Sequence, residues 1–471
     1  MTTGRRRALK GCSSTTATTA TIATTVTTAT TVMPAMTALG AILGTVALLA
    51  TATPAIADPS GANATAPAAT VATSPSDHPS APPTRPANER PAIERLSVTA
   101  DGTQGDASST SPSISADGRR VAFGSYASTF VPGETGKVAG VYVKDVRSGR
   151  LERIAAGDAR PGGSVGEPVI SGNGRYVAYR SEWVDVNTPG PYHGYVSDIL
   201  VRDLRTGRTE QVDVGLEEGY GVSAHGPAIS HDGRYVAFGA SSFPVTPGPS
   251  RPFRIFVRDR VAGTTEVVSA PPEDGATAAT SARISADGRV VAYQAHVPIL
   301  GGKIPRDVYA VDRRTGRVHR VDAPYDGSPS QRQSELTGIS ADGRYVVFDS
   351  PAANITADDP NGDGANVFVR DLWRGTTRRI DAADPARTTE HGELTADGRH
   401  LVYRDSGVGW VVRDLRTGRT RTALPPSAGG DRAAVDADGR SLVFDAYGAL
   451  VPEDTNNTYD VYLRRVRQPL P

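Results

Sequence analysis

The chain has 471 residues, and its 51 basic and 51 acidic side chains balance to a formal net charge of zero. Residues 1–57 carry four basic groups and no acidic group, so the rest of the chain is mildly acidic. It therefore lacks the basic surface that binds phosphate backbones, which argues against nucleic acid as a partner. The single cysteine, Cys12, excludes a disulfide framework and a cysteine-rich zinc site.

Residues 1–57 are predicted to be an export signal. Consecutive arginines near the start resemble a twin-arginine signal peptide, and an apolar run follows at residues 35–50. A bilayer core requires roughly 20 apolar residues, so this run is short for a permanent span, and an A-x-A cleavage site ends at Ala57. We expect a secreted protein that has no membrane span in its mature form. The alternative is a signal that stays uncleaved as a membrane anchor.

Residues 58–92 are predicted to be a spacer. They consist largely of Pro, Ala, Ser and Thr, with almost no large apolar side chain. Such a segment cannot bury enough apolar surface to offset the entropy lost on ordering, so we expect it to be disordered and extended.

From residue 93 onward, one unit repeats seven times. Its first half is a short strand, an Asp-Gly hairpin and a strand of the type Arg-Tyr-Val-Ala-Phe; its second half is a strand of the type Val-Phe-Val-Arg-Asp and a Thr-Gly turn. The period-two alternation predicts strands, and glycine accepts the positive φ of a tight hairpin. The hairpin glycines are Gly118, Gly174, Gly233, Gly288, Gly343, Gly398 and Gly439. The aromatic residues that close the second strand are Phe123, Tyr179, Phe238, Tyr293, Phe348, Tyr403 and Phe444.

Each unit thus holds four short strands, which we designate a to d. Four antiparallel strands repeated at a regular period are typical of a β-propeller blade. We predict an all-β fold, a seven-bladed β-propeller of four-stranded antiparallel blades over residues 93–471. The last copy lacks strand d, and residues 93–98 have the pattern of one. We therefore expect this N-terminal strand to complete the seventh blade and close the ring, which would leave no open sheet edge.

The repeat resembles that of a known family. The pattern S-x-D-G-x-x-V-A-F at 230–238, followed by the Val-Arg-Asp strand at 255–259, resembles the TolB-like, WD-type β-propeller repeats of bacterial envelope and secreted proteins. The resemblance covers residues 93–471. It implies a propeller fold and an extracytoplasmic location, and it specifies no ligand. The best-known TolB-like proteins carry six blades behind an α/β domain, whereas seven copies follow a spacer here.

Loop lengths indicate which face of the propeller carries function. The a–b and c–d turns are tight, whereas the b–c segments 124–140, 180–198, 239–254 and 349–366 are long. Long loops on a rigid scaffold commonly carry binding or catalytic residues. We predict a monomeric, non-catalytic scaffold that binds a protein or a cell-envelope glycan through this face. The alternative is a carbohydrate-active enzyme, a lyase or hydrolase, with its site at the channel mouth. No P-loop is present.

A calcium site is one interpretation of the fifth b–c loop. Asp359, Asn361 and Asp363, followed by Gly364, match the start of a calcium-binding loop with oxygen ligands two residues apart. The glutamate expected at position twelve is replaced by Arg370. The alternative is an Asx-rich turn whose side chains satisfy the local backbone. A weaker version of the pattern occurs at 453–458.

A second candidate site lies before the hairpins, where strand a approaches the channel. The residues are Glu167, His225, Arg283, His391, Glu393 and Arg432. They could bind a metal or a sugar acid; the alternative is the polar lining of a wet channel. The aspartate that ends strand c and the arginine after each Asp-Gly are interpreted as structural. We expect the aspartates to accept turn N–H groups and the arginines to pair with them.

Overall fold

The computed structural model describes residues 93–133, 136–157, 163–184, 195–216, 223–242, 251–269, 278–296, 306–328, 330, 332–430 and 432–466. All of them belong to one compact unit from Ser80 to Pro471. The predicted signal (1–57) and spacer (58–92) lie outside the described residues, so both stay predictions. Within the described part, no helix has the length and apolar character needed to cross a bilayer.

The described residues form 28 strands, which follow the seven sequence repeats. Repeat 1 contains β2 (Ser109–Ile114), β3 (Arg120–Ser125), β4 (Gly140–Asp145) and β5 (Leu151–Ala156). Repeat 2 contains β6 (Ser164–Ile170), β7 (Tyr176–Val184), β8 (Tyr195–Asp203) and β9 (Thr209–Gln211). Repeat 3 contains β10 (Ser223–Ile229), β11 (Tyr235–Ser242), β12 (Arg251–Asp259) and β13 (Thr264–Val267). Repeat 4 contains β14 (Ala278–Ile284), β15 (Val290–His296), β16 (Arg306–Asp312) and β17 (Arg317–Arg320).

The last three repeats follow the same plan. Repeat 5 contains β18 (Glu335–Ile339), β19 (Tyr345–Ser350), β20 (Asn366–Asp371) and β21 (Thr376–Ile380). Repeat 6 contains β22 (Thr389–Leu394), β23 (His400–Asp405), β24 (Gly409–Asp414) and β25 (Thr420–Leu424), followed by the short 3-10 helix η2 (Pro426–Ala428). Repeat 7 contains β26 (Ala433–Val435), β27 (Ser441–Tyr447) and β28 (Tyr459–Arg465), and β1 (Ile93–Arg95) pairs with its last strand.

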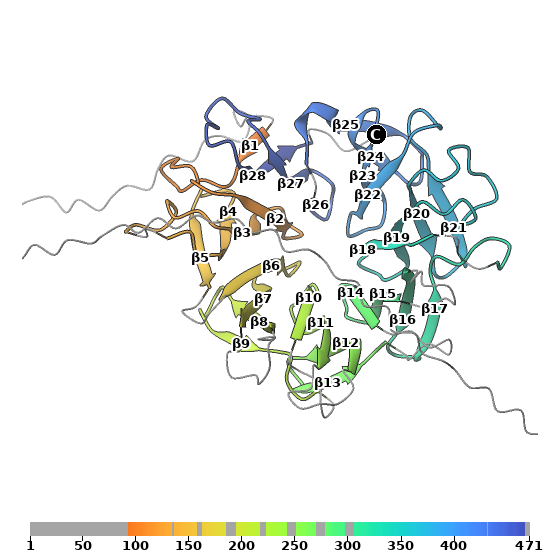
Figure 1. The fold of residues 1–471 in the computed structure, drawn as a ribbon, viewed down its shortest axis with the longest axis horizontal. Coiled ribbons are helices and arrows are strands. Elements are labelled where there is room, and N and C mark those ends of the chain that lie inside the picture. Colours follow the sequence, from red (N-terminus) through yellow and green to blue (C-terminus); the bar gives the residue numbers. More distant parts are fainter. Residues whose placement is uncertain are drawn as a thin grey trace, which may run out of the picture. The chain divides into compact units, whose positions relative to one another are not determined.

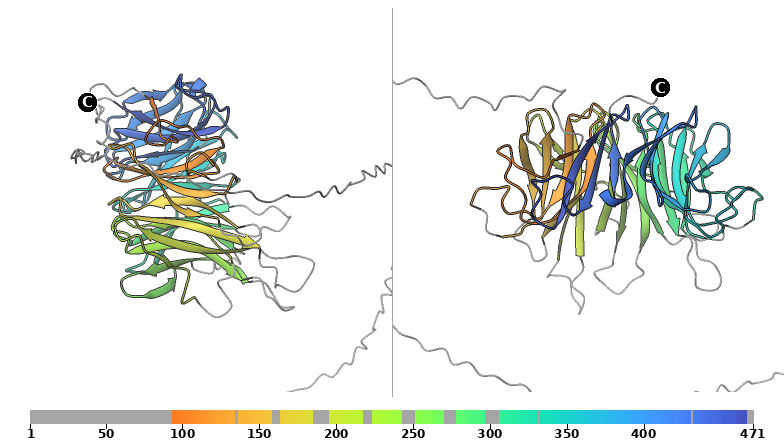
Figure 2. Two further views of the ribbon diagram at one scale, coloured as in Figure 1. Left: turned by 90° about the vertical axis from the view of Figure 1, so that its left-hand side faces the viewer. Right: turned by 90° about the horizontal axis from the view of Figure 1, so that it is seen from above.

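The fold is an all-β propeller of antiparallel four-stranded units. Figure 1 shows the repeats arranged in chain order around a common centre, with strand a of each repeat innermost. Figure 2 shows that the strands run along the direction from which Figure 1 is viewed. Every repeat is a simple meander in which neighbouring strands are joined by hairpins or b–c loops.

The number of separate sheets differs from the prediction. The sequence predicts seven four-stranded sheets, but the structure has five, and strands β6–β13 form one eight-stranded sheet. The reason is a single parallel bridge between Ser197 of β8 and Ser223 of β10. Strand β8 is nine residues long and extends beyond β9, which pairs only with residues 200–202 of β8. There the Ser197 hydroxyl donates to the carbonyl of Ala224 at 2.7 Å and accepts the N–H of Ala224 at 3.1 Å.

The first described strand is attached to the last. Strand β1 pairs antiparallel with β28, with Ile93 opposite Arg464 and Arg95 opposite Tyr462. The predicted strand 93–98 is thus formed over its first three residues. Beyond it, the N–H of Leu96 donates to the carbonyl of Val461 at 2.7 Å, and the Leu96 side chain is fully buried.

Backbone hydrogen bonds also join successive repeats next to the Asp-Gly hairpins. Each joins residues of the hairpins that follow strand a in two neighbouring repeats, at 2.9–3.1 Å. They link Ala116 to Gly172, Asn173 to His231, His231 to Ala286, Ala286 to Ala341, Ala341 to Ala396, and Ala437 to Ala116. The last of these joins repeat 7 to repeat 1. These main-chain hydrogen bonds therefore hold together the hairpin ends of repeats 1 to 6 in series, and those of repeats 7 and 1.

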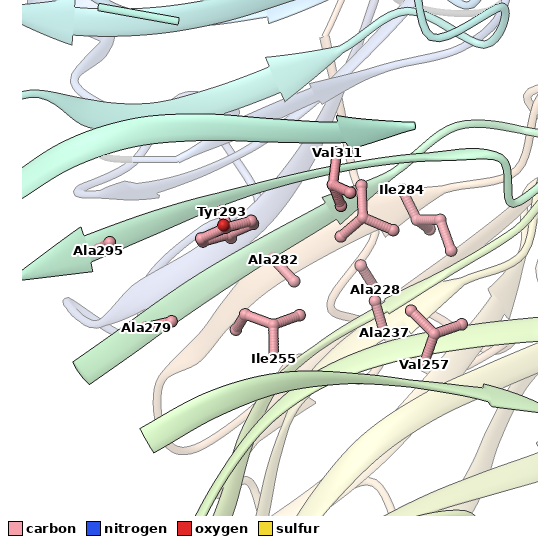
Figure 3. Close-up of a cluster of buried hydrophobic side chains, with 11 residues drawn as sticks. Ala228, Ala237, Ile255, Val257, Ala279, Ala282, Ile284, Tyr293, Ala295 and Val311 are labelled. Atoms are coloured by element: carbon pink, nitrogen blue, oxygen red, sulfur yellow. The ribbon is translucent and has the colours of Figure 1, made fainter. Parts of the chain in front are cut away.

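The core lies between neighbouring sheets. In the cluster between repeats 3 and 4, small residues such as Ala237 and Ala282 allow the sheets to approach, and Tyr293 fills the wider part (Figure 3). The predicted aromatic of strand b is buried in every repeat, at 0–3% exposure, which confirms its packing role. The hairpin glycines all have positive φ, as predicted; at Gly233 a Cβ would also lie 2.2 Å from the Tyr176 ring of the preceding repeat.

Candidate functional site

The tight-turn end of the propeller is neutralised by ion pairs. In repeats 2 to 6, the hairpin arginine binds the aspartate that ends strand c. The pairs are Arg175–Asp203, Arg234–Asp259, Arg289–Asp312, Arg344–Asp371 and Arg399–Asp414, at 2.5–3.0 Å. The remaining two hairpin arginines, Arg119 and Arg440, contact Asp117 and Asp438. This confirms the structural interpretation and leaves no ring of free cations among the hairpin arginines.

The strand-c aspartates also close the c–d turns. Asp259, for example, accepts the N–H groups of Val261 and Ala262, both at 3.0 Å. The guanidinium of Arg234 and these N–H groups stabilise its charged form and hold the pKa of Asp259 at about 2, although burial opposes the shift. The strand-c carboxylates at this end therefore serve to stabilise the turns and the ion pairs.

The innermost strands carry a repeated backbone irregularity nearer the opposite end. Strands β2, β6, β10, β14 and β22 each contain a register shift with a left-handed residue. The left-handed residues are Ser111, Glu167, Gly226, Ser281 and His391, with φ between 53° and 60°. This conformation costs roughly 1–2 kcal/mol for a residue with a Cβ. Bulges of this kind re-aim side chains, and they change the direction in which backbone N–H groups point.

Three of these bulges receive a carboxylate from the preceding repeat. Asp445 accepts the N–H of Ser111 at 2.9 Å, and Glu167 accepts the N–H of Gly226 at 3.0 Å. Asp349 accepts the N–H of His391 at 2.6 Å. Burial raises the pKa of Asp349 to about 7, against the stabilising effect of these N–H groups. Asp349 and Asp445 were not among the predicted site residues. The sequence pattern that marks them is an aspartate directly after the strand-b aromatic, which occurs only in repeats 5 and 7.

Two of the six predicted channel residues meet between repeats 2 and 3. Glu167 is exposed and pairs with Arg180 at 3.2 Å. His225 is half-buried, and its ring packs on Phe253 at a centroid distance of 4.5 Å. Burial lowers the pKa of His225, whereas the negative charge of Glu167 opposes that shift.

Arg283 and Glu393 approach each other across repeat 5. The Arg283 guanidinium donates to the carbonyl of Thr337 at 3.2 Å. Glu393 lies over the neighbouring Gly338, where an added Cβ would be 3.5 Å from its Oε2. Burial raises the pKa of Glu393 to about 7, and the positive charge of Arg283 opposes the shift. This carboxyl group therefore changes its charge near neutral pH.

The remaining two candidates make separate contacts. The ring of the exposed His391 lies 6.2 Å from that of Trp410. The Arg432 guanidinium donates to the Ser111 hydroxyl at 2.7 Å, which links repeat 7 to repeat 1. The contacts thus join four of the six residues in two pairs rather than in one cluster.

The predicted calcium ligands bind protein groups. Arg379 donates to Asp359 at 2.8 Å, and Arg332 donates to Asp363 at 2.8 Å. Asn361 exchanges side-chain hydrogen bonds with Asn366 and donates to the carbonyl of Arg387 at 2.8 Å. Across the described residues, no group of three or more His, Cys, Asp or Glu side chains is arranged to hold a metal ion. Calcium binding therefore stays a prediction without a preformed cluster of such ligands.

Repeat 7 shows what this loop motif does instead. Arg95 of β1 binds Asp454 at 3.1 Å, as Arg379 of β21 binds Asp359. Asn456 donates to the carbonyl of Gly105 at 2.8 Å, as Asn361 does to that of Arg387. In both repeats, the aspartate fixes the b–c loop to strand d and the asparagine fixes it to the segment that leads into the next repeat.

Comparison with known proteins supports the fold and gives no family. No protein-family model matches the chain, and no curated protein matches its sequence. An oligogalacturonate lyase in complex with manganese shares 12% identity over 80% of this chain and 93% of its own, with a TM-score of 0.50. The β-propeller domain of the Trilobed protease from Pyrococcus furiosus has 12% identity, coverages of 76% and 95% and a TM-score of 0.49. TolB from Acinetobacter baumannii has 17% identity, coverages of 70% and 77% and a TM-score of 0.35.

Proposed function

We propose that this chain is an exported, non-catalytic binding scaffold: a closed, seven-bladed β-propeller that holds a protein or cell-envelope glycan at the end opposite the tight turns. Closure is supported by the pairing of β1 with β28 and by the hydrogen bond from Ala437 to Ala116. The eight-stranded sheet corresponds to two blades that share one bridge, because each half keeps its own four-stranded meander.

The observation that carries the proposal is the contrast between the two ends of the repeats. At the tight-turn end, each hairpin arginine has a carboxylate partner and the main chains are bonded to each other. Nearer the opposite end, left-handed bulges place polar side chains of different repeats on the inner strands, and Glu393 is only half-buried. Backbone strain that recurs at equivalent positions is typical of sites that present side chains to a ligand.

A capture experiment tests this assignment. The tagged full-length protein is exported, immobilised and exposed to culture supernatant and to solubilised cell wall. The variants Arg283→Gln and Glu393→Gln alter the inner strands, and Arg289→Gln alters one tight-turn ion pair as the matched control. The proposal expects loss of partner capture from the first two and retention in the third. Loss confined to Arg289→Gln would place the binding surface at the tight-turn end instead.

The second candidate function is a carbohydrate-active enzyme. Two carboxyl groups with pKa values near 7, Glu393 and Asp349, favour it, because general acids and bases work best near the ambient pH. The likeness to oligogalacturonate lyase concerns the fold alone. Turnover of an acidic oligosaccharide that Glu393→Gln abolishes would favour this candidate over the scaffold.

A further inference from the structure

Repeat 6 differs from its neighbours in the layer of side chains that faces the preceding repeat. In repeats 1, 5 and 7, the b–c loop folds back onto the aromatic core. Phe130 packs on Tyr142 in repeat 1, and Ile355 joins the cluster around Phe368 in repeat 5. In repeat 6, only three residues separate β23 from β24, so no such loop exists.

At two further positions of this layer, repeat 6 has smaller side chains than the equivalent positions of other repeats. Strand c presents an aromatic ring to the strand-b aromatic in five repeats, for example Phe368 opposite Phe348. In repeat 6, the residue opposite Tyr403 is Val411. The strand-d residue opposite Val411 is Thr422, where repeats 5 and 7 have Arg379 and Arg95.

These three differences leave a cavity of about 370 Å³ between repeats 5 and 6. Its lining includes two carboxylates, Asp381 and Asp405, together with Tyr403, Val411, Arg413, Thr420 and Thr422. Asp381 is paired with Arg379 at 2.7 Å. Tyr403 and Val411 belong to the buried cluster that joins the two repeats, whereas Thr420 and Thr422 on β25 are exposed.

The charged side chains that line the cavity differ in how fully the protein already satisfies them with hydrogen bonds. Asp405 accepts the N–H groups of Ala383 at 2.7 Å and Gly407 at 2.8 Å, so backbone dipoles already offset its charge. Arg413 has a buried Nε without a hydrogen-bond partner, and it interacts with the hydroxyl of Tyr403. Burial, together with the positive charge of Arg413, lowers the pKa of the nearby Arg378 guanidinium, and Asp381 opposes the shift. A second guanidinium therefore reinforces positive potential beside Arg413.

We propose that this cavity is a binding site for a small hydroxylated organic acid, whose carboxylate binds Arg413 and whose hydroxyl groups bind Thr420 and Thr422. A guanidinium recognises a carboxylate through charge-assisted hydrogen bonds. The two threonine hydroxyls donate or accept as the ligand requires. Tyr403 and Val411 provide the face on which the carbon skeleton rests. The site is separate from the inner-strand residues of the proposed scaffold function.

A matched pair of probes tests the proposal on the full-length protein. Glucuronate and glucose differ in one carboxylate, and their binding is measured by isothermal titration calorimetry and saturation-transfer NMR. The proposal expects glucuronate to bind and glucose to bind roughly tenfold or more weakly, because a hydrogen bond to a charged group is lost. Equal binding of the two sugars, or no binding of glucuronate at millimolar concentration, would overturn the proposal.

Two variants locate the site. Arg413→Gln is expected to weaken glucuronate binding roughly tenfold or more, whereas Arg370→Gln, the equivalent change in repeat 5, leaves it unchanged. Val411→Phe restores the aromatic that other repeats carry and fills the cavity, so it should abolish binding while the thermal midpoint is kept or raised. Unchanged glucuronate binding in a folded Arg413→Gln or Val411→Phe protein would contradict this location.

Discussion

Arg95 in the first strand and Asp454 in the last b–c loop form a buried ion pair at 3.1 Å, with side-chain exposures of 5% and 2%. The hydroxyl of Tyr462 donates to the same carboxylate. A contact between residues 359 positions apart thus fixes the beginning of the described chain to its end.

Asp454→Ala should lower the free energy of unfolding by about 3–5 kcal/mol, because it leaves the Arg95 charge buried without its partner. Urea unfolding followed by tryptophan fluorescence measures the change. Asp438→Ala is the matched control, since Asp438 pairs with Arg440 on the surface and is 53% exposed. That pair should contribute less than about 1 kcal/mol. Equal losses in both variants would show that the Arg95 pair has no special role.

Glu393→Gln should change the pH dependence of stability. The folded-state pKa of Glu393 is raised to about 7 from an ordinary value of 4.5, so the unfolded state releases this proton first as the pH rises. The protonated carboxyl therefore contributes stability that is fully present below about pH 4.5 and is lost as the pH rises to 7.

Glutamine mimics the protonated form of Glu393 at every pH. The variant should match the parent near pH 4 and exceed it in urea midpoint at pH 8. Glu152→Gln, which alters a partly exposed carboxylate paired with Arg150, controls for the loss of a surface charge. A Glu393→Gln curve parallel to that of the parent from pH 4 to 8 would be inconsistent with this assignment.

Asp371→Ala should destabilise the protein more than Arg344→Gln does. Asp371 is buried and accepts the N–H groups of Trp373 at 3.0 Å and Arg374 at 3.2 Å, besides the Arg344 guanidinium. Its removal leaves turn donors without an acceptor, for a loss of about 1–3 kcal/mol. Arg344→Gln keeps those turn bonds and should cost within about 1 kcal/mol. Equilibrium unfolding ranks the two, and the reverse order would refute the role assigned to Asp371.

Asp359→Asn tests the loop motif against calcium binding. If the role of Asp359 is its ion pair with Arg379, the variant lowers the thermal midpoint by the same amount in the presence of calcium and in the presence of a chelator. Differential scanning calorimetry measures both conditions, and Glu152→Gln, which alters a partly exposed carboxylate outside this loop, is the control. A destabilisation seen only in calcium would restore the metal interpretation.

The repeating core could be predicted from the sequence because each signal is local. The Asp-Gly hairpin, the alternating strand b and its aromatic lie within nine residues, and they specify strands a and b and the buried ring. The Val-Arg-Asp strand and the turn after it specify strands c and d in the same local way. The bridge between repeats 2 and 3 was not predictable in this way. It depends on how far β8 extends beyond β9, where Ser197 bonds to Ala224.

The candidate sites were less predictable because their partners lie in other repeats. The pattern at Asp359 matches a calcium loop within its own segment, but its partner Arg379 is on the following strand d. The inner-strand residues likewise depend on distant positions, as the approach of Glu393 to Gly338 shows. The cavity beside Tyr403 results from a missing loop and two small residues, which only a comparison of packed repeats brings out.

Amide hydrogen exchange at Leu96 tests the closed ring most directly. The N–H of Leu96 donates to Val461 in the last repeat, so its exchange requires the first strand to detach. The account predicts that Leu96 in the full-length protein exchanges as slowly as Val347, a fully buried residue in the centre of β19. Rapid exchange at Leu96 while Val347 stays protected would show that the ring is open at this point.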